Sequence, residues 1–254
     1  MVRYGASGRE VVLRDGGYEA RIVTVGAGLA GLTYRGHEVI VPHRVDECPP
    51  AYLGKVLMPW PNRVAGGAYS WEGTSYDLPV DEPAFGTSLH GFVAFQDWQV
   101  DRADASSVQL STLIAARYSY PWTLLASARY SLDARAGLAV ELSATNVGQG
   151  TAPLGVGFHP YLAVDGIAAD DLELTNPASI IYEADVSMIP VAAHDVAGFG
   201  LDFRSPARIG DAGLDHCFAG LPPGTWTVTL RDPDSGVGVS LSSDARWLQV
   251  YTAD

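Results

Sequence analysis

Cysteine and long hydrophobic runs are both scarce in this sequence of 254 residues. Its two cysteines, Cys48 and Cys217, lie far apart and form no CxxC spacing, so neither a disulfide framework nor a zinc site is expected. We expect a structural role for both, because free cysteine commonly behaves as a small buried hydrophobe. No apolar run could span a bilayer, and residues 1–10 lack the apolar core of a secretory signal. These absences predict a cytoplasmic protein.

Basic residues are also few. The chain has 16 Lys and Arg against 29 Asp and Glu, which gives a formal net charge of −13. Such a surplus of negative charge repels phosphate backbones and anionic lipid headgroups. It predicts neither a nucleic acid nor a membrane partner and favours a small neutral or cationic molecule. At this length folding buries roughly 70–75% of the unfolded surface, so the core needs neither disulfides nor a structural metal.

Apolar and polar residues alternate over many short stretches. A period of two is typical of β-strands, and turn signals such as DGG (15–17) and DPDSG (232–236) separate the stretches. The predicted strands lie at residues 11–13, 19–25, 37–41, 108–114, 126–132, 138–144, 225–231, 237–241 and 247–252. Gly and Pro are spread along the whole chain rather than gathered in a linker. The pattern therefore predicts one all-β domain over residues 1–254, with more than ten strands closing into a large sandwich or barrel.

One glycine-rich stretch has the spacing of a dinucleotide-binding loop. Residues 26–31, GAGLAG, satisfy G-x-G-x-x-G and follow a predicted strand. That function requires a helix to begin at the glycines, so that its N-terminus meets the pyrophosphate. The residues that follow, LTYRGHEVIV (32–41), instead have the pattern of a turn and another strand. We interpret the stretch as a glycine-rich β-turn.

Four segments combine polar side chains with glycine or proline: MPWPNRVAGG (58–67), TSLHGF (87–92), GVGFHPYL (155–162) and GLDHCF (213–218). Two prolines in the first hold the chain extended and present Asn62 and Arg63 side by side. Each segment also has an ordinary interpretation. Asn62 and Arg63 can form a surface turn with a salt bridge. His90 and His159 can be buried histidines bonded to backbone carbonyls, and Asp215 can be a loop acid.

In their order along the chain these residues resemble the motifs of the aldose 1-epimerase (galactose mutarotase) family. The resemblance runs from about residue 20 to the end, through PNRVAGG (61–67), LHG (89–91), GFHPY (157–161), LDHCF (214–218) and LQVYT (248–252). It implies a large, mostly antiparallel β-sandwich, the galactose mutarotase-like supersandwich, which agrees with the predicted strands. It implies no cofactor, and a free sugar, an aldohexose, as the substrate. Members of the family interconvert α and β anomers by opening and reclosing the sugar ring, which needs an acid at the ring oxygen and a base at the C1 hydroxyl.

The resemblance also implies roles for single residues. His159 would protonate the ring oxygen, a role suited to a side chain whose ordinary pKa is roughly 6.5. His90 would donate a hydrogen bond close to the same oxygen. Trp60 or Trp122 can pack against a sugar face, although packing in the core is the ordinary role of each. The residues implied to bind sugar hydroxyls, by fixed donors and a paired acceptor, are Asn62, Arg63, Asp215 and Gln249.

The family's general base is a glutamate beyond the segment matched by LQVYT (248–252), and no residue of this sequence matches it. We therefore expect that the chain lacks the family's C-terminal end, in preference to an inactive or altered protein. We assign the base neither to Asp215 nor to Asp254.

Other functions fit parts of the pattern. A carbohydrate-binding module on the same fold would hold the sugar without catalysis. A glycoside hydrolase needs two carboxylates roughly 5–10 Å apart, whereas these motifs offer histidine where the acid would stand. A sugar phosphate would call for further cations near the site, so the net charge and the single Arg63 in the motifs favour an unphosphorylated sugar.

Overall fold

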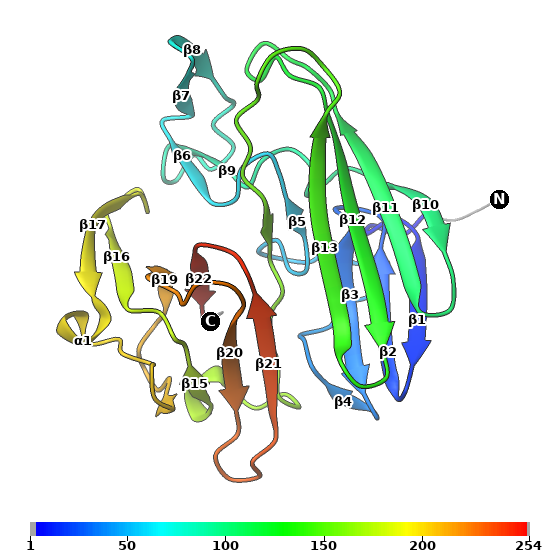
Figure 1. Ribbon diagram of the computed structural model, residues 1–254, viewed down its shortest axis with the longest axis vertical. Coiled ribbons are helices and arrows are strands. Elements are labelled where there is room, and N and C mark those ends of the chain that lie inside the picture. The colour runs from blue at the N-terminus through cyan, green and yellow to red at the C-terminus, as the bar shows by residue number, and fades with distance from the viewer. Residues whose placement is uncertain (1–3, 253–254) are drawn as a thin grey trace. The chain divides into compact units, whose positions relative to one another are not determined.

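The computed structural model describes residues 4–252, which form strands joined mostly by turns (Figure 1). The chain divides into two compact units, Met1–Tyr161 and Leu162–Asp254. In residues 4–252 the helical segments are a 3₁₀ turn, η1 (Ala169–Asp171), and one turn of α-helix, α1 (Val196–Phe199). Neither is long and apolar enough to cross a membrane. The predicted all-β fold class is therefore confirmed.

The first unit is built on two four-stranded antiparallel sheets (Figure 1). One sheet has the order β1 (Glu10–Asp15), β2 (Tyr18–Val23), β3 (Gly28–Tyr34) and β4 (His37–Glu38). The other has the order β10 (Gln99–Ala103), β11 (Ser107–Ile114), β12 (Leu124–Asp133) and β13 (Gly137–Asn146). Strand β1 lies against β11 and β12, so the two sheets pack as a sandwich.

The alternating pattern of the sequence buries one face of each sheet. Along β12 every second side chain from Leu124 to Leu132 is buried, because successive side chains of a strand point to opposite faces. Tyr130, fully buried on this face, donates its phenol O–H to the carbonyl oxygen of Ala27 (2.5 Å), in the turn between β2 and β3. This hydrogen bond links the two sheets. The strands predicted at 108–114, 126–132 and 138–144 lie inside β11, β12 and β13.

Short strands complete the first unit. They form three antiparallel pairs, β5 (Val56–Leu57) with β14 (Gly157–Phe158), β6 (Arg63–Ala65) with β9 (Thr87–Leu89), and β7 (Ala68–Trp71) with β8 (Thr74–Asp77). Two to four residues are too few for an alternating pattern to show, so sequence periodicity did not predict these strands.

The second unit contains two further four-stranded antiparallel sheets. One has the order β18 (Ala207–Arg208), β15 (Glu173–Thr175), β20 (Trp226–Arg231) and β21 (Gly238–Ser243). The other has the order β17 (Pro190–Asp195), β16 (Ile180–Ala184), β19 (Asp215–Ala219) and β22 (Leu248–Tyr251). Side chains such as Trp226 and Leu174 form the core of the first sheet, and Phe218 and Ile181 that of the second.

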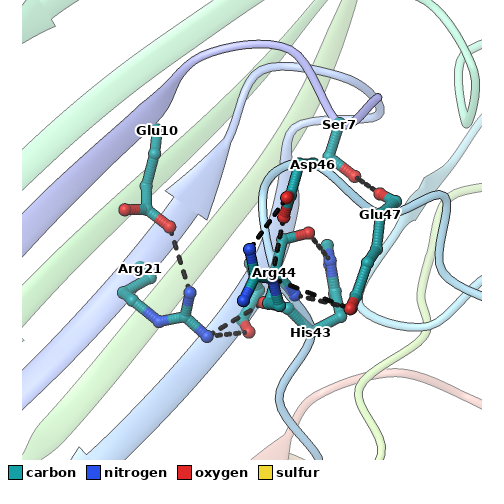
Figure 2. A network of polar contacts seen from close by, with 8 residues as sticks. Ser7, Glu10, Arg21, His43, Arg44, Asp46 and Glu47 are labelled. Atoms are coloured by element: carbon teal, nitrogen blue, oxygen red, sulfur yellow. Dashed lines mark hydrogen bonds and ion pairs between the residues drawn. The ribbon is translucent and has the colours of Figure 1, made fainter. Parts of the chain in front are cut away.

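A polar network anchors the loop between β4 and β5 (Figure 2). The Arg21 guanidinium, on β2, donates to the carbonyl oxygens of Ala30 and His43 (both 2.9 Å) and pairs with Glu10 (3.1 Å). Arg44 donates to both carboxylate oxygens of Asp46 (2.9 and 2.8 Å). The network ties the loop to the first sheet.

Two expectations from the sequence are wrong in detail. Cys48 is exposed in this loop, whereas Cys217 is partly buried, with the pKa of its thiol raised by burial. The strand predicted at 37–41 ends at Glu38. The Val39 amide still donates to the Leu32 carbonyl oxygen of β3 (2.9 Å), but the Val41 amide donates to that of Tyr161 (2.8 Å).

The glycine-rich stretch at 26–31 contains no helix, as predicted, and lies in the turn after β2 and at the start of β3. Gly26 has a φ of +74°, and a Cβ built there would lie 2.3 Å from the Ala94 carbonyl oxygen. The glycine therefore serves close packing of backbone segments, which is a structural role.

We predict that Gly26→Ala destabilises the protein by at least about 2 kcal/mol more than Gly36→Ala. Both glycines are left-handed, with φ values of +74° and +88°, but a Cβ at Gly36 meets nothing within 4 Å. Urea denaturation of both variants separates the steric clash from the backbone strain that they share. Equal losses of stability would contradict this account.

Candidate functional site

Residues 54–62 lie between two histidines of the first unit, His90 and His159. On one edge the His159 amide donates to the Lys55 carbonyl oxygen (3.0 Å). Further along, the Gly155 amide donates to the Pro59 carbonyl oxygen (2.6 Å). These bonds extend the β5–β14 pair at both ends, and they fix the main chain at His159.

The other edge of the same segment holds His90. The Phe92 amide donates to the Met58 carbonyl oxygen (2.7 Å), and the His90 amide donates to that of Asn62 (2.9 Å). Gly91 is required for this approach, because a Cβ there would lie 2.1 Å from the Met58 oxygen. Both histidine segments are therefore bonded to opposite edges of one stretch of backbone.

The ring of His90 is held in one tautomer. Its Nδ1 accepts a hydrogen bond from the Asn62 amide (2.9 Å), so the proton of the neutral ring is on Nε2. Burial, with the nearby positive charges of His159 and Arg63, lowers the pKa of His90 to about 3. A neutral ring with a fixed Nε2–H can act only as a hydrogen-bond donor at that nitrogen.

Four rings follow one another through the site. The ring of Tyr52 meets that of His90 edge-on (4.5 Å between centroids), and His90 meets His159 in the same way (5.4 Å). The ring of Tyr161 stacks on His159 (5.3 Å, 19° between planes). The structure thus brings the two predicted histidines together, with a tyrosine at each end of the row.

Arg63 lies beside the histidines and is paired. Its Nε and Nη2 donate to the two carboxylate oxygens of Glu82 (2.8 and 2.9 Å), and Nη1 donates to Oδ1 of Asn62 (3.2 Å). The side chains of Arg63 and Glu82 are only 14% and 17% exposed. The salt bridge proposed as the ordinary interpretation of Arg63 therefore exists, but in a mostly buried position.

Lys55, the only lysine of the chain, lies in the segment 54–62 that holds the backbones of the two histidines. Its side chain is 1% exposed, and Nζ donates to the carbonyl oxygen of Val25 (2.7 Å). Burial lowers the pKa of the amine to about 8. Lys55 thus accepts the His159 amide at its carbonyl oxygen, and its amine is hydrogen-bonded to the turn after β2.

Asp215 and Gln249 are together in the second unit. In the register of β19 and β22, Cys217 lies opposite Gln249, so Asp215 is one diagonal step away on the same face. Nε2 of Gln249 donates to Oδ1 of Asp215 (2.7 Å). Phe218 and Leu248, on the opposite face, belong to the apolar core. The carboxylate and the amide are thus hydrogen-bonded to each other outside that core.

The tryptophans differ in environment. Trp122 is 7% exposed and packs against Tyr76 and Tyr120, which is the core role expected for it. Trp60 is partly buried and meets the ring of Phe92 edge-on (4.8 Å). Within residues 4–252 no three His, Cys, Asp or Glu side chains are grouped as metal ligands.

Sequence reasoning missed Glu82 and Tyr52. Glu82 lies in DEPAF (81–85), an acidic turn with no motif, and only its 19-residue separation from Arg63 is visible in the sequence. Tyr52 has a φ of +55°, a backbone state that no sequence signal marks at a tyrosine.

Comparison with known proteins identifies the family of the chain. The sequence model of the family described as aldose 1-epimerase matches residues 9–254. The chain belongs to the aldose 1-epimerase family. Among its relatives, the uncharacterized protein YihR of Escherichia coli K12 is 41% identical over 248 residues, or 98% of this chain and 80% of that protein. Human galactose mutarotase is 26% identical over 220 residues, 80% of this chain and 63% of that protein. The chain thus spans less than two thirds of the human member's length.

Solved structures of the aldose 1-epimerase family share the fold. A GalM/aldose epimerase homologue from Caenorhabditis elegans superposes with a TM-score of 0.85 at 23% identity, over 96% of this chain and 81% of that one. Galactose 1-epimerase from Lactobacillus acidophilus gives a TM-score of 0.75 at 25% identity, over 87% and 72%. The predicted galactose mutarotase-like sandwich is therefore confirmed.

We predict that His90 makes the stability of this epimerase-family protein depend on pH. Between pH 6.5 and about 3 the unfolded chain binds a proton at His90 that the folded chain excludes. The free energy of unfolding therefore falls as the pH falls through this window, by up to about 1.4 kcal/mol per pH unit for one proton. Urea denaturation across the window should give a shallower slope for His90→Gln than for the wild type, and an unchanged slope for His37→Gln, whose residue is exposed on β4. Equal slopes in all three proteins would rule out this role of His90.

Proposed function

We propose that the protein is an aldose 1-epimerase that interconverts the α and β anomers of a free aldohexose. The observation that carries the proposal is the contact between the rings of His90 and His159, one of them fixed as a neutral donor, with Arg63 beside them. Membership of the aldose 1-epimerase family supports it. A single-domain organisation and a cytoplasmic location stay predictions.

The two histidines have different parts in the proposed reaction. His159 protonates the ring oxygen of the sugar as the C1–O bond opens, and takes the proton back when the ring recloses on the other face. His90 cannot supply that proton at neutral pH, because its pKa is lowered to about 3. Its Nε2–H instead donates a hydrogen bond to the ring oxygen of the sugar and stabilises the negative charge that develops there as the C1–O bond opens. We assign the base at the C1 hydroxyl to no residue of this chain.

Sugar binding is assigned to Asn62, Arg63, Asp215 and Gln249. Arg63 and Asn62 are already bonded to each other (3.2 Å), and so are Gln249 and Asp215 (2.7 Å). In each pair one side chain has N–H donors and the other has an acceptor oxygen, and the two hold each other in place. This suits sugar hydroxyls, which both donate and accept hydrogen bonds. Pairing also reduces the entropy lost when the sugar binds.

The second candidate is a carbohydrate-binding module on the same fold. The polar pairs favour it as much as they favour an enzyme, since they require no chemistry. The two functions differ at His159: a binding module needs no proton donor, so its removal would leave sugar binding intact and there would be no catalysis to lose.

We predict that His159→Ala lowers kcat for mutarotation by about 10²–10⁴-fold, the contribution typical of a general acid. Polarimetry of freshly dissolved α-D-glucose and α-D-galactose measures the rate, with a protein-free blank. His37→Ala, a substitution of an exposed histidine, serves as the matched control and should keep full activity. Near-normal activity in His159→Ala would remove the residue from the reaction, whereas sugar binding by an inactive wild type would favour the binding module.

We predict that Arg63→Lys raises KM about tenfold, because lysine keeps the charge next to Glu82 but loses the planar fork. The matched control is Arg14→Lys, at an exposed Arg14–Glu19 ion pair (2.7 Å), which should leave KM unchanged. Initial rates over a range of sugar concentrations give both constants. If KM and kcat were the same in all three proteins, Arg63 would not bind substrate.

A further inference from the structure

Glu82 is the one carboxylate partner of the proposed sugar-binding arginine among the described residues, and its side chain is partly buried. Its two oxygens receive Nε and Nη2 of Arg63 at 2.8 and 2.9 Å, the two-point contact that fixes a guanidinium in both position and plane. With 14% and 17% of the two side chains exposed, the pair is poorly screened by water. Glu82 therefore determines where the Arg63 fork points.

Glu82 is itself held in place. Oγ1 of Thr87, at the start of β9, donates to Oε2 of Glu82 (2.5 Å). The backbones of the two residues also bond to each other, Glu82 N to Thr87 O at 3.1 Å and Thr87 N to Glu82 O at 3.3 Å. Burial by itself would raise the pKa of the Glu82 carboxyl, but the hydrogen bonds from Arg63 and Thr87 and the charge of Arg63 lower it. The carboxylate is thus ionised at neutral pH.

These contacts leave two N–H donors of Arg63 for a ligand. A guanidinium has five N–H donors. Two go to Glu82 and one goes to Oδ1 of Asn62, so 5 − 3 leaves two, one on each terminal nitrogen. The ring of Phe85 covers one face of the guanidinium, 5.2 Å from ring centroid to Cζ. Two free donors on neighbouring nitrogens suit the oxygens of two neighbouring hydroxyls.

We propose that Glu82 is a positioning residue that holds the Arg63 fork and cancels its charge, so that Arg63 binds a pair of neighbouring uncharged hydroxyls and discriminates against phosphate. The proposal rests on the proposed function, because it takes Arg63 as a sugar-binding residue. A phosphate at the two free N–H groups of Arg63 would lie near the Glu82 carboxylate, and at low screening the repulsion between the two anions offsets the attraction to the guanidinium. Two hydroxyls carry no charge and gain the hydrogen bonds without the repulsion.

The test compares Glu82→Gln and Glu82→Asp with the wild type, using inorganic phosphate as the anionic probe. Glutamine removes the charge and puts an N–H donor against the arginine, so the fork moves and the cation is no longer neutralised. We expect KM for α-D-galactose to rise about tenfold, with kcat within about twofold, because hydrogen bonds made equally in ground and transition states are lost. Inhibition by phosphate should become at least about tenfold stronger.

Glu82→Asp separates position from charge. Aspartate keeps the negative charge but is one methylene shorter, so KM should rise while the weak inhibition by phosphate stays at the wild-type level. Glu19→Gln, which breaks the exposed Arg14–Glu19 ion pair, is the matched control and should change neither quantity. Thermal melting shows which variants are folded. If Glu82→Gln does not fold, the KM of Glu82→Asp still tests the proposal.

The outcomes distinguish this proposal from the function on which it rests. Titration of wild type and Glu82→Gln with phosphate, followed by ³¹P NMR, reports anion binding without any activity. A wild type that accelerates mutarotation, with unchanged KM and unchanged phosphate binding in folded Glu82→Gln, overturns the role of Glu82. A wild type without mutarotation overturns the proposed function alone, and stronger phosphate binding by Glu82→Gln would then still support charge cancellation at Arg63.

Discussion

The backbone of residues 54–62 is the constraint on which the candidate site depends. One edge of this stretch receives the His159 amide, and the other edge receives the His90 amide. Main-chain hydrogen bonds have a narrow range of lengths, so strand geometry sets the separation of the two histidine backbones. The short β5–β14 pair thus has a larger effect on the site than its size suggests.

Two residues that join the 54–62 segment to the His90 segment have a strained backbone. Asn62 and His90 both have left-handed φ values, +59° and +60°, and each is the hydrogen-bond partner of the other. A non-glycine residue held in this region costs on the order of 1–3 kcal/mol and persists only where its surroundings over-determine it. Here two reciprocal bonds hold it, one of them to the imidazole itself. The strained turn and the tautomer of His90 are therefore one structural unit.

Sequence periodicity predicted the long strands because burial of one sheet face imposes a period of two, as along β12. The glycines at 26–31 were correctly separated from a nucleotide loop by the strand pattern that follows them. The sequence could not reveal Glu82, because an ion pair between distant loops leaves no periodic trace. Nor could it show that Cys48 is exposed, since side-chain burial in an irregular loop is decided by tertiary packing. Family resemblance supplied the histidines as candidates, and the contacts supplied the tautomer of His90 and the backbone support of both residues.

The burial of Lys55 has a chemical consequence for a protein of this family. Every free aldose spends some time as an open-chain aldehyde, and aldehydes condense with unprotonated amines. A lysine whose pKa is lowered to about 8 would be unusually reactive if it met such an aldehyde. In this chain the only lysine is buried, and its amine donates a hydrogen bond to the Val25 carbonyl oxygen. These 254 residues therefore expose no lysine side chain to covalent modification by sugars.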